Sequence, residues 1–167
     1  MPFSSNLRGV SVDARLPNDL VEEALVAGRL DPLAGYPALR REVTHGQSRF
    51  DFLLEAPGRL SCLVEVKSIT LVVDGLGCFP DAVTLRGRRH VNELAQAVSA
   101  GYRAAVVFCV QRDDAIGVRP HDESDPDFGQ ALRNVAAEGV EVYAYACRVE
   151  PGSAEIAGSL PVYLAPA

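Results

Sequence analysis

The stretch SRFDFLLEAPGRLSCLVEVKS, residues 48–68, restricts the fold of this chain more than any other part of it. Two apolar runs flank a Pro-Gly pair, a pattern that is typical of a β-hairpin. Asp51 lies inside the first run, and Glu65 and Lys67 lie inside the second. Charged side chains in a strand interior are costly to bury unless they are paired or bind a metal. The hairpin therefore contains either a solvated strand face or a functional site.

Burial of one apolar face sets the pairing of the two strands, because a one-residue slip exchanges the faces of a strand. A three-residue loop at 57–59 makes one face uniformly apolar, with the pairs Phe50–Val66, Phe52–Val64 and Leu54–Cys62. The same pairing sets Asp51 opposite Glu65, whereas a loop of two or four residues sets Asp51 opposite Val64. The apolar pattern favours the three-residue loop. Directly opposed side chains have Cβ atoms about 4.5–5.5 Å apart.

Two carboxylates held this close repel one another unless a cation or a proton lies between them. Two carboxylates, completed by water and a substrate phosphate, suit Mg²⁺. Lys67 is on the same face as Glu65 and would orient or activate an attacking water. This arrangement fits metal-dependent hydrolysis of a phosphodiester. The alternative is a solvated strand face on which Arg49 and Lys67 neutralise Asp51 and Glu65.

The composition is that of an ordinary globular protein, with 167 residues, 48% hydrophobic and 23% charged. This length fits one domain. No apolar run reaches the roughly 18 residues of a membrane helix, and the N-terminus has no apolar signal-peptide core. We therefore expect a cytoplasmic protein that does not associate with membranes. The net charge of −6 argues against broad, charge-driven nucleic-acid binding but allows a local basic patch at RGRRH, residues 86–90.

The cysteines and histidines show no pattern that indicates a metal site. Cys62, Cys78, Cys109 and Cys147 form no CxxC pair. Buried reduced thiols are the expected state for these four cysteines, rather than a zinc site or a disulfide. The three histidines also lack the spacing of metal ligands.

The order of elements predicts an α/β fold. Helices are expected at 16–30, 86–101 and 125–138, and strands at 39–45, 48–55, 60–72, 103–111 and 140–149. The resulting order, α-β-β-β-α-β-α-β, indicates a mixed central sheet flanked by helices. The domain is expected to span 17–149, with a lead-in at 1–16 and a peripheral tail at 150–167.

Longer segments resemble a known family. These are VSVDARLPNDLVEEAL, LRREVTHGQSRFDFLL, VEVKSITLV and FPDAVTLRGRRHVNEL, followed by VQRDD and GVEVYAY. In this order they are similar to the sugar fermentation stimulation protein (SfsA-like) family over nearly the whole chain. Asp51 followed by Glu65-x-Lys67 resembles the core motif of the PD-(D/E)XK nuclease superfamily. The resemblance implies a restriction-endonuclease-like fold and an Mg²⁺- or Mn²⁺-dependent nuclease acting on DNA or RNA. A DNA-binding regulator of sugar metabolism, with little or no catalysis, is the alternative.

The resemblance also implies roles for individual residues. Asp51, Glu65 and Lys67 match the core motif, with Asp51 and Glu65 as the metal ligands. Glu23, in the first helix, falls where a further acid can contribute, and its neighbour Glu22 is then expected to point to solvent.

Residues around the second helix allow two interpretations each. Arg86, Arg88 and Arg89 would contact substrate phosphates, or would form an exposed basic turn. His90 would carry a proton or, as we favour, would be a hydrogen-bonded structural histidine. Asp81 would orient a metal-bound water, or, as we favour, would cap the following turn.

Full-length relatives in this family carry an N-terminal OB-like region before the VSVD segment, and we expect this chain to lack it. OB-folds bind single strands through a basic groove and aromatic platforms. Tight independent DNA binding is therefore not expected. The sequence leaves the oligomeric state open, and a homodimer is one alternative.

Overall fold

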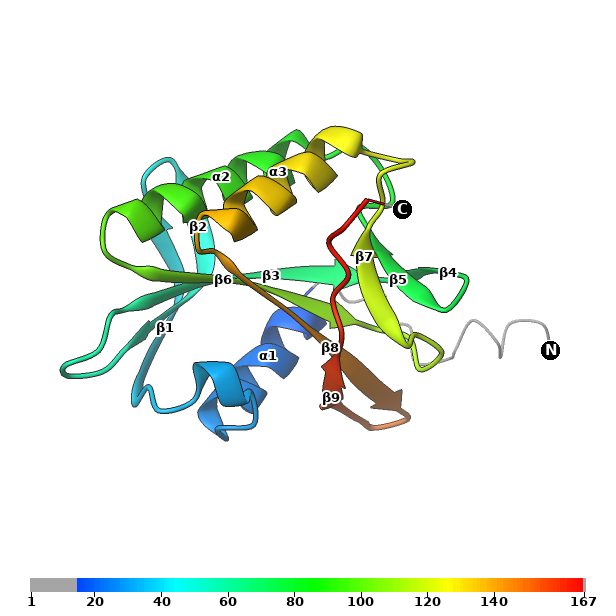
Figure 1. The fold of residues 1–167 in the computed structure, drawn as a ribbon. Helices are drawn as coiled ribbons and strands as arrows, with labels where there is room; N and C mark the ends of the chain where they lie inside the picture. The colour runs from blue at the N-terminus through cyan, green and yellow to red at the C-terminus, as the bar shows by residue number, and fades with distance from the viewer. Residues whose placement is uncertain (1–14, 167) are drawn as a thin grey trace.

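The computed structural model describes residues 15–166, which are built around a six-stranded sheet (Figure 1). The strands lie side by side in the order β1, β2, β3, β6, β8, β9. Their bounds are β1 Ala38–His45, β2 Ser48–Glu55, β3 Cys62–Ile69, β6 Arg103–Val110, β8 Glu141–Glu150 and β9 Ser153–Leu160. The β3–β6 and β6–β8 pairs are parallel, whereas β1–β2, β2–β3 and β8–β9 are antiparallel. The predicted mixed sheet is confirmed.

Helices cover both faces of this sheet (Figure 1). The bounds are α1 Leu16–Val26, α2 Leu85–Ser99 and α3 Pro126–Ala137, with a short 3₁₀ helix, η2, at Asp31–Leu33. In the view of Figure 1, α2 and α3 lie above the sheet and α1 lies below it. Because both faces are covered, the central strand β6 is apolar along almost its whole length. No helix in residues 15–166 is long and apolar enough to cross a membrane.

Local signals set the starts of α2 and α3. The Thr84 hydroxyl accepts the Gly87 N–H at 2.9 Å, and the Asp125 carboxylate accepts the Phe128 N–H at 3.0 Å. Asp125 also accepts the Thr84 N–H at 2.8 Å, so one carboxylate links the starts of both helices. Thr84 therefore caps α2.

A second, three-stranded sheet was not predicted. It has the order β4–β5–β7, with bounds β4 Leu71–Val73, β5 Leu76–Phe79 and β7 Gly117–Pro120. Asp74 and Gly75 connect β4 to β5 with φ of 51° and 81°, as a tight two-residue hairpin requires. The single strand expected over 60–72 is therefore two strands, β3 and β4, which belong to different sheets. Short strands that contain glycine give little periodic signal.

The C-terminal segment adds the last strand to the main sheet. The sequence predicts a peripheral tail from residue 150, but β9 pairs with β8 along most of its length. Beyond β9, the Val118 N–H donates to the Pro161 carbonyl at 2.9 Å, which ties this segment to β7. The lead-in expected at residues 1–16 lies almost entirely outside the described residues.

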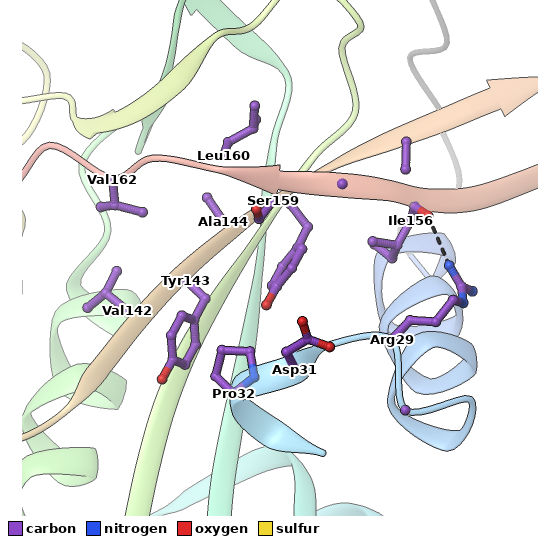
Figure 2. Close-up of a pocket in the computed structure, with 14 residues that line it drawn as sticks. Arg29, Asp31, Pro32, Val142, Tyr143, Ala144, Ile156, Ser159, Leu160 and Val162 are labelled. Atoms are coloured by element: carbon purple, nitrogen blue, oxygen red, sulfur yellow. Dashed lines mark hydrogen bonds between the residues drawn. The ribbon is translucent and has the colours of Figure 1, made fainter.

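Residues 28–32 and the β8–β9 hairpin line a cavity of about 860 Å³ (Figure 2). Arg29 spans one end of it, where Nη1 donates to the Ile156 carbonyl at 2.9 Å. The rest of the lining is largely aliphatic, together with Tyr143 and Tyr145. None of the residues predicted to bind metal or nucleic acid lines this cavity.

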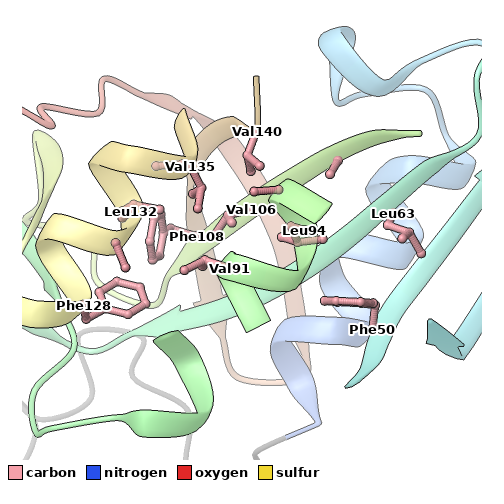
Figure 3. Close-up of a cluster of buried hydrophobic side chains, with 14 of the residues drawn as sticks. Phe50, Leu63, Val91, Leu94, Val106, Phe108, Phe128, Leu132, Val135 and Val140 are labelled. Atoms are coloured by element: carbon pink, nitrogen blue, oxygen red, sulfur yellow. The ribbon is translucent and has the colours of Figure 1, made fainter. Parts of the chain in front are cut away.

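Two apolar clusters form the core, one on each face of the main sheet. The cluster beneath α2 and α3 includes Phe108, Phe128 and Leu132, which meet in Figure 3. The cluster between α1 and the sheet includes Leu20 and Val21. It also includes the strand residues that alternate along the sequence with those of the other cluster. Strands β3 and β6 therefore lie between two apolar layers. A charged side chain on either strand needs a partner within the protein, or a bound ion, to offset the cost of its burial.

Cys109 of β6 and Cys147 of β8 form a disulfide between neighbouring strands. Cys62 and Cys78 are free and buried. The expectation of buried thiols is therefore confirmed for two cysteines and wrong for the other two. Cys109 and Cys147 are 38 residues apart, and only the parallel β6–β8 pairing makes them neighbours.

Candidate active site

The register of the β2–β3 hairpin is the predicted one, with Phe52 opposite Val64 and Leu54 opposite Cys62. The ladder ends at the Phe52–Val64 pair, so the next two residues, Asp51 and Glu65, are not paired in it as predicted. Beyond the Phe52–Val64 pair the side chains of β2 change faces. Phe50 packs in the core cluster between the sheet and helices α2 and α3, whereas Phe52 packs in the cluster between the sheet and α1. The expected pairing of Phe50 with Val66 is therefore absent.

A distortion in β1 accompanies this change of faces in β2. Asp51 has no partner in the β1–β2 ladder, and the residue across from it, Glu42, has a φ of 54°. A positive φ is uncommon outside glycine. The distortion frees the backbone around Asp51 from regular pairing on both sides.

The Asp51 side chain accepts the hydrogen bond that the Val66 N–H would otherwise donate to the backbone of β2. One of its oxygens, Oδ2, accepts the Val66 N–H at 2.7 Å. The other, Oδ1, accepts from the Asn18 amide nitrogen at 2.9 Å, so the first turn of α1 also holds the carboxylate. These two contacts fix Asp51 beside Glu65, the residue before Val66.

Glu65 is only 3% exposed, and its two oxygens have different surroundings. Oε2 lies 2.9 Å from the Lys67 ammonium and 2.5 Å from His90 Nδ1. Oε1 is buried and has no hydrogen-bond partner among residues 15–166. A buried carboxylate oxygen without a partner is rare in native proteins and calls for an explanation such as an absent ion or water.

The pKa values of the two acids shift in opposite directions. Burial raises the pKa of Asp51 to about 6, and the negative charge of Glu65 adds to that rise. Burial also disfavours ionised Glu65, but hydrogen bonds and charge from His90 and Lys67 outweigh it and lower the pKa of Glu65 to about 2. Glu65 is therefore ionised near neutral pH, whereas Asp51 holds its charge at a cost.

The carboxylate oxygens of Asp51 and Glu65 are suitable ligands for a small divalent cation. Carboxylate oxygens are hard ligands, Glu65 Oε1 has no hydrogen-bond partner in the described part of the chain, and a second carboxylate lies beside it. Within residues 15–166 no group of three or more His, Cys, Asp or Glu side chains is arranged to hold a metal. The side chains thus supply two carboxylates, and other oxygens must complete the shell, as is usual for Mg²⁺.

The two glutamates of α1 are oriented opposite to expectation. Glu23 is 59% exposed, and its carboxylate pairs with Arg29 at 3.2 Å. Glu22 is partly buried and lies 3.1 Å from Arg41. Because residues four apart share one side of a helix, Glu22 lies on the side of Asn18, which holds Asp51. The partly buried glutamate of the two is therefore Glu22, and the exposed one is Glu23.

The arginines at the start of α2 do not act as one group. Arg88 pairs with Asp127 of α3 at 3.0 Å, whereas Arg86 and Arg89 are exposed. Arg86 lies one turn before His90 and therefore on the side of the helix that faces Glu65. Of the three arginines, Arg86 is therefore the one that shares a side of α2 with His90.

Sequence reasoning missed Asn18 as part of this site, and it favoured a structural role for His90. Asn18 resembles an ordinary helix-start residue, and nothing near it in the sequence indicates a contact with Asp51. His90 is separated from Glu65 by the whole β4–β5 hairpin, so only the packing of α2 on β3 reveals their contact.

A mixed central sheet with helices on both faces is a nuclease-like α/β fold. A family model described as the sugar fermentation stimulation protein RE domain matches residues 15–153. This chain belongs to that family.

Two relatives illustrate the similarity. The sugar fermentation stimulation protein homologue of Moorella thermoacetica is 50% identical over 155 residues, which cover 93% of this chain and 67% of that protein. The homologue of Symbiobacterium thermophilum is 54% identical over 161 residues, or 93% of this chain and 64% of that protein.

A solved structure is also similar, that of Pyrococcus furiosus SfsA in complex with Ca²⁺. Its TM-score is 0.85 at 30% sequence identity, and the match covers 91% of this chain and 66% of that one. This chain thus spans about two thirds of the length of the proteins that it matches.

Proposed function

We propose that this chain is a divalent-metal-dependent nuclease domain that hydrolyses phosphodiester bonds in DNA or RNA. One observation carries the proposal: Asp51 and Glu65 lie side by side in a largely buried site, and Glu65 Oε1 has no partner among the described residues. The family relative from Pyrococcus furiosus was solved in complex with Ca²⁺, which supports the binding of a divalent cation in this family.

In this proposal Asp51 and the Oε1 atom of Glu65 hold Mg²⁺ or Mn²⁺. When bound, such an ion supplies charge neutralisation at the phosphate and a water of lowered pKa. Lys67 lies on the other oxygen of Glu65, 2.9 Å from Oε2. Its ammonium group would orient the attacking water and stabilise the negative charge that develops on the phosphate. Glu22 takes the place proposed for Glu23 as a further acid near the site.

The start of α2 would bind substrate phosphates. Arg86 and Arg89 are exposed there, and the N-terminal end of a helix itself favours anions. Arg88 is committed to Asp127 and is expected to contribute less. Since the chain as a whole carries a net charge of −6, phosphate binding must depend on this local patch.

Cleavage of single- and double-stranded DNA and RNA, with Mn²⁺ or with EDTA, tests the proposal. Wild type should cleave at least one substrate with Mn²⁺ only. Asp51→Asn and Lys67→Ala should each lower the rate by about 100-fold or more, since each removes a charge that acts in the transition state. Glu155→Gln, which changes an exposed acid paired with Arg148 on the β8–β9 hairpin, is the matched control and should cleave like wild type. Full activity in Asp51→Asn would refute the proposal.

A DNA-binding regulator without catalysis is the second candidate, because the described side chains supply only two carboxylates close together. This alternative requires salt-sensitive DNA binding that survives Asp51→Asn and Lys67→Ala, without cleavage in wild type. Arg86→Ala should then weaken binding more than Arg88→Ala does. Binding that responds equally to the two arginine changes would argue against α2 as the contact surface.

A further inference from the structure

His90 is a buried polar side chain to which the proposed hydrolysis assigns no role. It is 3% exposed, and its Nδ1 atom lies 2.5 Å from Glu65 Oε2 and 3.3 Å from the Lys67 ammonium. The Phe50 ring packs edge-on against the imidazole, with 6.0 Å between the ring centroids. The imidazole is therefore held between an apolar neighbour and the Glu65 carboxylate.

The contact with His90 makes the two oxygens of Glu65 unequal. The terminal torsion of a glutamate is broad and nearly two-fold, so rotamer preference alone does not fix where each oxygen points. Lys67 reaches Oε2 through a flexible four-carbon stem. The imidazole is a rigid ring carried by the second turn of α2, and it is the stiffer of the two constraints.

We propose that His90 is a positioning residue: it donates from Nδ1 to Glu65 Oε2 and thereby presents Oε1, beside Asp51, to a divalent cation. The inference rests on the metal site of the proposed function and goes beyond it, because it assigns the orientation of that site to α2. Partners of ligating groups commonly contribute about 10–100-fold to metal affinity, by fixing the direction of a ligand.

Titration of the full chain with Ca²⁺ alone, followed calorimetrically, tests this role without requiring cleavage. His90→Leu should weaken Ca²⁺ binding by about 10–100-fold, because the carboxylate loses its rigid donor. His90→Asn should retain most of the affinity, since the asparagine side-chain nitrogen can occupy the position of Nδ1. Val91→Ala is the matched control: Val91 is the next residue of α2 and is fully buried in the core. It should lower the melting temperature and leave the Ca²⁺ dissociation constant unchanged.

The outcomes separate this inference from the proposed function. Equal Ca²⁺ affinity in wild type and His90→Leu would overturn the role of His90 while leaving the metal site intact. A loss in Val91→Ala as large as that in His90→Leu, or no retention in His90→Asn, would reduce the role of His90 to packing and would also overturn it. Absence of Ca²⁺ binding in wild type would overturn the inference together with the metal site.

Discussion

Glu65 and Asp51 differ in the donors that surround them. Glu65 accepts from the charged Lys67 and from His90, whereas the donors to Asp51 within residues 15–166 are the neutral Val66 N–H and the Asn18 amide. Hydrogen bonds from charged donors are roughly twice as strong as those between neutral groups. The protein therefore stabilises one carboxylate of the pair and leaves the other to be stabilised by something that binds there.

This difference predicts how Asp51→Asn changes the stability of the metal-free protein. The pKa of Asp51, about 6 against an ordinary 3.8, means that the folded state loses stability as pH rises through this interval. Asp51→Asn removes this loss of about 3 kcal/mol, but its NH₂ group replaces one of the two oxygens that accept hydrogen bonds, so the free energy of unfolding should rise by only about 1–2 kcal/mol at about pH 7.5. Near pH 4 the gain should disappear. Urea unfolding in EDTA at both pH values measures the effect.

Glu65→Gln is the matched variant and should act in the opposite direction. The pKa of Glu65, about 2, means that its ion pairs stabilise the fold fully above about pH 4.5 and lose this effect as pH falls toward 2. Glu65→Gln should therefore destabilise the protein near neutral pH, since it leaves the Lys67 ammonium without its carboxylate. If both variants changed the unfolding free energy in the same direction, the opposite roles assigned to the Asp51 and Glu65 charges would be wrong.

At the scale of elements, the register of the β2–β3 hairpin could be predicted from the sequence. The side of α1 that faces Asp51 and Glu65 could not. Burial of Phe52, Leu54 and their partners selects one register, because every other register exposes an apolar face. In α1, by contrast, Glu22 and Glu23 flank the apolar stripe on its two sides. The sequence does not say which side faces the acids, since this depends on how the helix crosses the sheet.

The path of β2 was also beyond the sequence. The apolar pattern predicts that Phe50 lies on the face of Phe52, but the strand turns at Asp51 and sends Phe50 to the other core cluster. Glu42, across from Asp51 in β1, has a positive φ at this point. A glutamate gives no indication of a positive φ in the sequence. The candidate site lies where regular pairing fails, which is the place that periodicity describes least well.

The orientation of α1 predicts different effects for two substitutions in it. Asn18→Ala removes a donor to Asp51 and should lower the Mn²⁺-dependent cleavage rate about tenfold, as for other partners of metal ligands. Glu23→Gln breaks only an exposed ion pair with Arg29 and should leave the rate unchanged. Initial rates at saturating Mn²⁺ provide the comparison. A larger loss in Glu23→Gln than in Asn18→Ala would mean that the assignment of the α1 faces is wrong.

At the scale of the molecule, the sequence predicts the central layers and misses the additions at their edges. Long strands covered on both faces, such as β6, leave continuous apolar runs that are easily recognised. The β4–β5–β7 sheet and β9 are short or edge elements, rich in glycine or small residues, and their patterns resemble those of loops. The Cys109–Cys147 disulfide likewise depends on the parallel pairing of β6 with β8, which no local pattern encodes.

Location of a bound cation tests the central claim most directly. Crystals grown with Mn²⁺ allow the ion to be placed by its anomalous scattering, independently of any activity. The account predicts an anomalous peak between the Asp51 carboxylate and Glu65 Oε1, and no such peak in Asp51→Asn crystals. A peak elsewhere with none at this position, or one that persists in Asp51→Asn, would contradict the assignment of these two acids as the metal site.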